Sequence, residues 1–199
     1  VAVPPDVIAD GVERELSAYP DAVVTDVASV KGQPLRALRA RDVDLTRYIG
    51  SHPMAGRERG GAIAARADLF VGRPWVVCRD EETAAADLAL VEGLALDLGA
   101  MPIEMAPEEH DRSVALVSHV PQLVSSLLAA RLTAAPEDAL RLAGQGVRDT
   151  TRLAASAPEL WVQILGANAA PVVDVLDAFA AALAAVADAV RPPDAAGPR

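Results

Sequence analysis

Aromatic residues and cysteine are scarce in this chain. Aromatics make up 3% of the 199 residues, whereas hydrophobic residues as a whole make up 52%. A core must therefore be built mainly from Ala, Val and Leu, which favours close packing of helices. The single cysteine, Cys78, excludes an internal disulfide. Its position in a short apolar run favours a small buried side chain over a reactive thiol.

Basic residues are outnumbered by acidic ones. The chain has 18 Lys and Arg against 28 Asp and Glu, a formal net charge of -10, and Lys31 is its single lysine. A protein that binds nucleic acid needs a basic face, and no run of Lys or Arg supplies one. We therefore expect no nucleic-acid partner, and an anionic substrate would need a locally positive pocket.

Long uninterrupted apolar runs are lacking as well. No stretch reaches the roughly 20 residues of a membrane span without a charge or a proline. The Ala-rich stretch 179–190 comes closest, and Asp188 lies within it. No signal peptide opens the chain. We expect a cytoplasmic protein that contacts no membrane.

Short apolar runs alternate with helical patterns in the first half. We expect strands at residues 1–3, 22–27, 48–50, 75–78 and 101–105, and helices at 5–18, 32–40 and 81–98. Gly99 ends the last of these helices, and Pro102 favours an edge position for the last strand. Alternation of this kind predicts a mostly parallel, doubly wound α/β sheet.

The second half contains helical patterns only. We expect helices at residues 108–131, 136–142, 158–166 and 168–190. The last is apolar nearly all round, so a partner subunit is expected to cover it. This divides the chain into an α/β part (1–106), an all-helical part (107–191) and a disordered tail (192–199).

Ser29 and Lys31 follow a predicted strand and precede a predicted helix. Side chains at such a position lie at the sheet edge near a helix N-terminus, which is a natural anion or ribose site. The alternative is an N-cap role for Ser29 and a solvated Lys31.

His52 lies between a predicted strand end and a Pro/Gly loop. Its imidazole would stand at the carboxyl edge of the sheet, where α/β enzymes keep their ligands, and its pKa suits proton transfer near neutral pH. Gly56, Gly60 and Gly61, interleaved with charged residues, suggest a mobile flap. The alternative is a loop histidine satisfied by its neighbours.

Two further features bear polar side chains in the helical half. His119 lies within a predicted helix that Pro121 should kink, so it could face a pocket or be a core histidine bonded to freed carbonyls. Arg148 and Arg152 stand four residues apart and could clamp a carboxylate from one helical face. The alternative for the two arginines is a surface pair satisfied by acidic neighbours.

Five motifs, taken in order, resemble the prephenate/arogenate dehydrogenase family of tyrosine biosynthesis. They are residues 26–31, 52–56, 67–70 with 73–75, 118–121 and 148–152. The resemblance runs over nearly the whole chain. It implies the later portion of a Rossmann nucleotide domain followed by an all-helical dimerisation domain, and hence a homodimer.

The resemblance also implies oxidative decarboxylation of prephenate or arogenate, with NAD or NADP as cofactor. His52 would be the base at the 4-hydroxyl, with Ser29 bonded to the same hydroxyl. Arg152 would clamp the side-chain carboxylate in preference to Arg148, and Glu58 would gate it. The remaining site residues implied are His119 and Gln122 around the substrate and Val3, Pro4, Pro5, Asp26, Ser29 and Lys31 around the cofactor.

Gln122 departs from the family pattern, because many members have a second histidine at that position. An amide cannot be cationic, so prephenate and arogenate both remain open as substrates. The chain also lacks the glycine-rich G-x-G-x-x-G segment, so the choice between NAD and NADP cannot be read. Two other interpretations are a dimerisation module without catalysis, and another Rossmann-plus-helical dehydrogenase such as a β-hydroxyacid or imine reductase.

Overall fold

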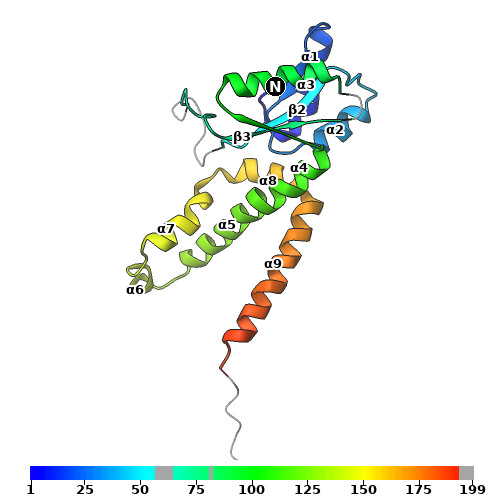
Figure 1. Ribbon diagram of the computed structural model, residues 1–199. Helices are drawn as coiled ribbons and strands as arrows, with labels where there is room; N and C mark the ends of the chain where they lie inside the picture. The colour runs from blue at the N-terminus through cyan, green and yellow to red at the C-terminus, as the bar shows by residue number, and fades with distance from the viewer. Residues whose placement is uncertain (57–64, 81–82, 193–199) are drawn as a thin grey trace, which may run out of the picture.

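A computed structural model describes residues 1–56, 65–80 and 83–192. A sheet flanked by helices forms one end of the molecule in Figure 1, and the helices of the second half extend away from it as two diverging arms. The order of elements places the four strands in the first half and helices alone in the second, among the described residues.

The sheet contains β1 (Val24–Asp26), β2 (Tyr48–Pro53), β3 (Pro74–Cys78) and β4 (Met101–Met105), in that spatial order. β1 and β2 are parallel, as are β3 and β4, whereas β2 and β3 are antiparallel. The expected α/β sheet is confirmed, with one antiparallel pairing at its centre. β4 lies at an edge of the described sheet, as Pro102 suggested.

The expected strand at residues 1–3 is reduced to a single point of pairing. The terminal amine of Val1 donates to Thr25 O, and Val27 N donates to Val1 O at 3.1 Å. Val1 thus bonds to the residues before and after Asp26, which is the pattern of a parallel ladder. Residues 2 and 3 are not in a strand, so the prediction was wrong for them.

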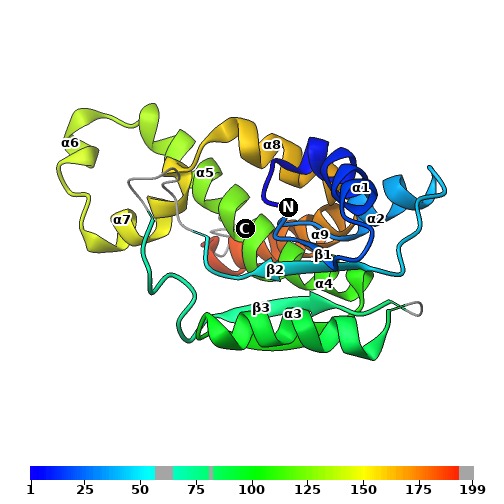
Figure 2. The same cartoon turned by 90° about the horizontal axis from the view of Figure 1, so that it is seen from above.

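Helices cover both faces of the sheet. After the short 3-10 turn η1 (Pro5–Val7), α1 (Ile8–Ala18) and α2 (Gly32–Arg39) share one core with β1, and that core includes Tyr48. α3 (Ala85–Asp97) packs on β3 and β4 over a second core, which includes Ile49. Tyr48 and Ile49 are adjacent in β2 and point to opposite faces of the sheet. Figure 2 shows α3 running along β3. Gly99 follows α3 with φ +78, the left-handed conformation expected of it.

The second half begins with an almost continuous helix. α4 (Pro107–Val114), a π-helical turn η3 (Ala115–His119) and α5 (Val120–Thr133) follow one another without a break. Val120 N donates to Ala115 O, five residues back, just before Pro121. Because proline has no N–H, the helix cannot keep its usual bonding there, and the wider turn accommodates the loss.

The remaining helices are α6 (Glu137–Leu140), α7 (Gln145–Thr151), the 3-10 turn η4 (Arg152–Ala155), α8 (Pro158–Ala167) and α9 (Ala169–Val190). α9 buries only Val172 and exposes a row of large apolar side chains, namely Val173, Phe179, Leu183, Val186 and Val190. By length and composition alone, α9 and the helical stretch Pro107–Thr133 could each cross a membrane. The absence of membrane contact therefore stays a prediction.

Candidate active site

An open cleft of about 440 Å³ lies between the sheet and the helical half. Ser29, in the loop after β1, and His52, near the end of β2, line it from the sheet side. Gln122 of α5, Arg152 of η4 and Trp161 of α8 line it from the helical side. Four residues that the sequence singled out for a site are therefore brought to one cleft from four separate segments.

The ring of His52 is held from behind by a second histidine. His52 Nδ1 lies 2.8 Å from His110 Nε2, and His110 Nδ1 lies 2.8 Å from Asp111 Oδ1. His110 is fully buried and Asp111 is 5% exposed. Neither residue was among the predicted site residues. The predicted bond of Ser29 to the substrate hydroxyl stays a prediction.

Asp111 also caps a helix of the other half of the chain. Its carboxylate accepts from the backbone N–H of Lys31 at 2.8 Å and of Gly32 at 2.9 Å, at the start of α2. A Cβ at Gly32 would lie 2.8 Å from Arg36 Nη1 and 2.9 Å from Asp111 Oδ2, so a larger residue would force these side chains to move. The N-cap role considered for Ser29 is wrong, because the side chain that bonds the first N–H groups of α2 comes from α4.

Burial is the main cause that favours the neutral form of His52. Burial lowers the pKa of His52 well below its ordinary value, and His110, Lys31 and then His119 act in the same direction. Burial alone would raise the pKa of Asp111. Hydrogen bonds from His110 and from the N–H groups that Asp111 caps outweigh burial and lower that pKa. The chain thus has a neutral imidazole at the cleft and an ionised carboxylate behind it.

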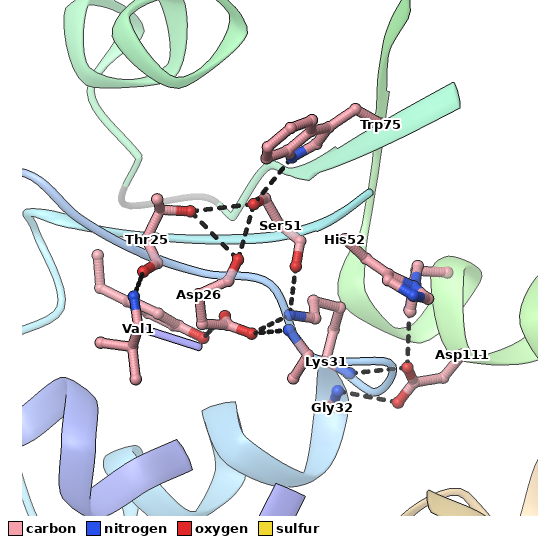
Figure 3. A network of polar contacts seen from close by, with 12 residues as sticks. Val1, Thr25, Asp26, Lys31, Gly32, Ser51, His52, Trp75 and Asp111 are labelled. Atoms are coloured by element: carbon pink, nitrogen blue, oxygen red, sulfur yellow. Dashed lines mark hydrogen bonds and ion pairs between the residues drawn. The ribbon is translucent and has the colours of Figure 1, made fainter. Parts of the chain in front are cut away.

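Lys31 and Asp26 form a buried ion pair rather than an exposed ligand site. Lys31 is 2% exposed and Asp26 is 0% exposed, and the Lys31 ammonium also donates to Ser51 O at 2.6 Å. Tyr48 Oη donates to the second oxygen of Asp26 at 2.7 Å. Figure 3 shows this network between β1, β2 and the start of α2.

One expectation is corrected by this ion pair. The solvated Lys31 is wrong, because its ammonium is enclosed with Asp26. The cofactor contacts of Asp26 and Lys31 stay a prediction, and both side chains are bonded inside the fold.

His119 belongs to the core under the cleft. It is 1% exposed, and Asn168 Nδ2 lies 3.1 Å from its Nδ1. Its ring stands edge-on to Trp161, with centroids 6.0 Å apart. Burial is the main cause that lowers the pKa of His119, to about 4. Of the two interpretations of His119, the core histidine agrees with its burial. Its neighbours Ser118 and Gln122 line the cleft.

Gln122 has a fixed amide orientation. Its Nε2 donates to Leu153 O at 2.9 Å and to Ser126 Oγ at 3.3 Å. A backbone carbonyl can only accept, so the amide nitrogen must face Leu153. The other end, Oε1, is buried and has no partner among the described residues.

The two arginines of the fifth motif lie in different surroundings. Arg152 is the first residue of η4 and lines the cleft, whereas Arg148 is exposed on α7 and does not. The preference for Arg152 over Arg148 agrees with this placement. The gating role of Glu58, together with the rest of the flap after Gly56, lies outside the described residues.

Val3, Pro4 and Pro5 follow the residue that pairs with β1. Pro5 is buried at the start of η1, while Val3 and Pro4 are exposed. Val1 runs parallel to β1, so the residues that follow it lie toward the carboxyl ends of the strands. Nucleotides bind at that edge of the sheet in this class of fold. The cofactor contacts of Val3, Pro4 and Pro5 stay a prediction. Among the described residues, no three His, Cys, Asp or Glu side chains gather to hold a metal ion.

Comparisons with known proteins decide the family. Residues 1–104 match the nucleotide-binding domain of prephenate dehydrogenase, and residues 106–197 match its dimerization domain. The chain belongs to the prephenate dehydrogenase family. This confirms the resemblance stated from the five motifs, and it confirms a Rossmann-type portion followed by the helical domain of that family.

Relatives of the prephenate dehydrogenase family include more than one activity. The chain is 40% identical over 192 residues to the probable prephenate dehydrogenase NovF of Streptomyces niveus, covering 96% of this chain and 53% of that protein. It is similar to Aquifex aeolicus prephenate dehydrogenase in complex with hydroxyphenyl propionate and NAD+, with 28% identity, a TM-score of 0.82 and coverage of 94% and 66%. It is also similar to Synechocystis arogenate dehydrogenase, with 30% identity and a TM-score of 0.75, over 94% of this chain and 68% of that one. The chain thus spans about half to two thirds of the length of these relatives.

Proposed function

We propose that this chain is the later part of an enzyme that oxidatively decarboxylates prephenate to 4-hydroxyphenylpyruvate. The observation that carries the proposal is the cleft itself. His52, a neutral imidazole bonded to His110, and Arg152 line the same cavity. A base and a carboxylate anchor are the two groups that the reaction demands of the protein.

The substrate is a cyclohexadienol that bears a ring carboxylate, a side-chain carboxylate and a 4-hydroxyl. His52 accepts the proton of the 4-hydroxyl as the carbinol carbon is oxidised. The ring carboxylate leaves as carbon dioxide, its bonding electrons complete the aromatic ring, and the phenolate oxygen recovers a proton. When bound, NAD or NADP accepts the hydride from the carbinol carbon.

The other residues of the cleft position the substrate and the cofactor. Arg152 pairs with the side-chain carboxylate through two parallel N–H donors. Ser29 lies at the same cleft wall as His52 and would bond the 4-hydroxyl. Val3, Pro4 and Pro5 would border the nicotinamide. Val3, Pro4 and Pro5 follow the residue that pairs with β1, and Ser29 follows β1 itself. They fit a nicotinamide cofactor because they lie beyond the carboxyl ends of parallel strands.

Arogenate is the second candidate substrate, and the similarity to Synechocystis arogenate dehydrogenase favours it. Gln122, where many family members have a histidine, lines the cleft and is one position at which the two substrates could be distinguished. With arogenate the product would be tyrosine.

A homodimer formed through the helical half is part of the proposal. The exposed apolar side chains of α9 need a cover, and the match of this half to a dimerization domain supports a second copy. Light scattering of the full-length enzyme should give twice the mass of one chain. A cytoplasmic location is also proposed, because the chain is similar to prephenate dehydrogenases.

The direct test is nicotinamide reduction by the full-length enzyme. Prephenate and arogenate are each offered with NAD and with NADP, and reduced nicotinamide is followed by fluorescence. Reduction that depends on one of the two substrates supports the proposal and identifies substrate and cofactor together. The absence of reduction in all four combinations would contradict it and favour a binding module.

A further inference from the structure

A histidine–aspartate pair on α4 stands behind His52, away from the cleft. Neither His110 nor Asp111 lines the cleft, and both are buried. Their hydrogen bonds form one line of three side chains, from the ring of His52 through His110 to a carboxylate. Such a line constrains where each ring carries its proton.

The donor and acceptor in each of these hydrogen bonds can be assigned from Asp111 onward. Asp111 accepts from two backbone N–H groups of α2, and its pKa is lowered, so it is an anion that can only accept. His110 Nδ1 must therefore carry a proton and donate to it. When His110 carries this single proton, its other ring nitrogen, Nε2, is an acceptor. His52 Nδ1 is then the donor across the 2.8 Å contact.

We propose that His110 and Asp111 are positioning residues that keep the proton of His52 on Nδ1 and leave its Nε2 lone pair free as the base. The contact with His110 orients the His52 ring, and Asp111 in turn holds the His110 ring. This is the logic of a catalytic base oriented by a third group. The assignment of the base to the dehydrogenase reaction rests on the proposed function, whereas the position of the proton does not.

The pair also makes the base depend on contact between the two halves of the chain. His110 and Asp111 belong to the helical half, and His52 belongs to the sheet. Asp111 is held in place by the N-terminus of α2, through Lys31 N and Gly32 N. The helical half thus supplies the groups that prepare the base in addition to one wall of the cleft.

The position of the proton can be measured without turnover. Full-length protein labelled with ¹⁵N-histidine is examined by long-range ¹H–¹⁵N correlation, and His52→Asn, His110→Gln and His119→Asn assign the signals. At neutral pH we expect His52 and His110 protonated on Nδ1. His119 should be protonated on Nε2, because Asn168 donates to its Nδ1. A proton on Nε2 of His52, or a doubly protonated His110, would overturn the proposal.

Kinetics of matched variants test the consequence. His110→Leu removes the acceptor behind His52, so kcat should fall about 100-fold, the lower range for loss of a general base, with KM changed less than about threefold. His110→Gln keeps an acceptor for His52 and a donor for Asp111, and should recover part of the rate. Glu109→Gln removes an exposed charge one residue away on the same helix and should leave kcat unchanged.

Asp111→Asn separates positioning from folding. It keeps an oxygen to cap α2 but removes the fixed anion, so the Nδ1 preference of His52 should be lost while the far-ultraviolet circular dichroism is kept. Wild-type kcat and an unchanged His52 tautomer in both His110→Leu and Asp111→Asn would contradict the proposal. If the enzyme reduces nicotinamide with neither substrate, the proposed function fails, and the tautomer measurement still decides this inference.

Discussion

Lys31 donates from its ammonium group to the carbonyl oxygen of Ser51 at 2.6 Å, and this bond joins the loop of Ser29 to the strand of His52. Ser51 is the residue before His52, and its hydroxyl donates to Asp26 O at 2.7 Å. Trp75 Nε1 donates to the same hydroxyl at 3.0 Å. A buried network therefore fixes the backbone from which the His52 ring projects, as Figure 3 shows.

Lys31→Met should destabilise the protein by about 3–5 kcal/mol, because it leaves the buried Asp26 carboxylate without its cation. Thermal unfolding measures the loss. The double variant Lys31→Met with Asp26→Asn should lose less than Lys31→Met alone, since the neutral amide can still accept from Tyr48. Equal stability of Lys31→Met and the wild type would show that the ion pair is not formed.

Gly32→Ala should displace Asp111 without changing any ionisable group. The added Cβ would lie 2.8 Å from Arg36 Nη1 and 2.9 Å from Asp111 Oδ2. The end of the arginine can turn away, whereas Asp111 is held by its hydrogen bonds, so we expect the cap of α2 to weaken by about 1 kcal/mol and kcat to fall. Denaturant unfolding and steady-state kinetics measure the two effects. Gly93→Ala is the matched control in α3, where a Cβ meets nothing within 4 Å, and it should be neutral or slightly stabilising. A Gly32→Ala enzyme that behaves like Gly93→Ala would argue against the cap.

Arg152→Gln should weaken substrate binding more than it lowers kcat, because a clamp on the side-chain carboxylate acts in both ground state and transition state. A charge-assisted hydrogen bond of about 1.5–3 kcal/mol corresponds to a rise in KM of roughly 10- to 100-fold. Arg148→Gln is the control, because Arg148 is exposed outside the cleft. A larger effect at Arg148 than at Arg152 would reverse the assignment.

The acid limb of the pH profile should lie below pH 6.5. His52 works as a base only when unprotonated, and burial together with His110, Lys31 and His119 lowers its pKa well below 6.5. Activity should therefore persist as pH falls through 6.5 and disappear only at lower pH. The measurement is kcat/KM against pH, which reports the free enzyme. A limb centred at or above pH 6.5 would contradict a buried neutral His52.

Much of the fold can be predicted from the sequence, because hydrophobic periodicity and the residues that end helices are local properties. The alternation of strands with amphipathic helices predicts the layers, and Gly99 ends α3 as expected. The antiparallel pairing of β2 with β3 could not be predicted, because an apolar run does not specify the direction of its neighbour. The pairing of Val1 likewise depends on which strand lies beside it.

Part of the site could be found from motifs, and the rest depends on contacts between distant segments. Ser29, His52 and Arg152 carry recognisable spacing, and they meet in one cleft. His110 and Asp111 were missed, because they stand in an acidic stretch typical of a solvated face. Their one local signal is the spacing of Pro107, His110, Asp111 and Val114, which repeats every three to four residues and marks the buried face of α4.

Lys31 illustrates the same limit. A lone lysine after a strand is usually solvated, and only the approach of Asp26, Ser51 and Gly50 encloses it. A Cβ at Gly50 would lie 3.4 Å from Lys31 Cδ and 3.3 Å from the hydroxyl of Tyr48. The small residue thus leaves the room that the ion pair occupies, which no local pattern reveals.

The kinetics of His52→Asn test the central claim most directly. Turnover of the full-length enzyme is measured with its better substrate, next to the wild type and Glu109→Gln. Because His52 acts in the transition state, kcat should fall by about 10²- to 10⁴-fold while KM stays nearly constant. A His52→Asn enzyme with wild-type kcat would contradict the account, and the base would have to be sought elsewhere in the cleft.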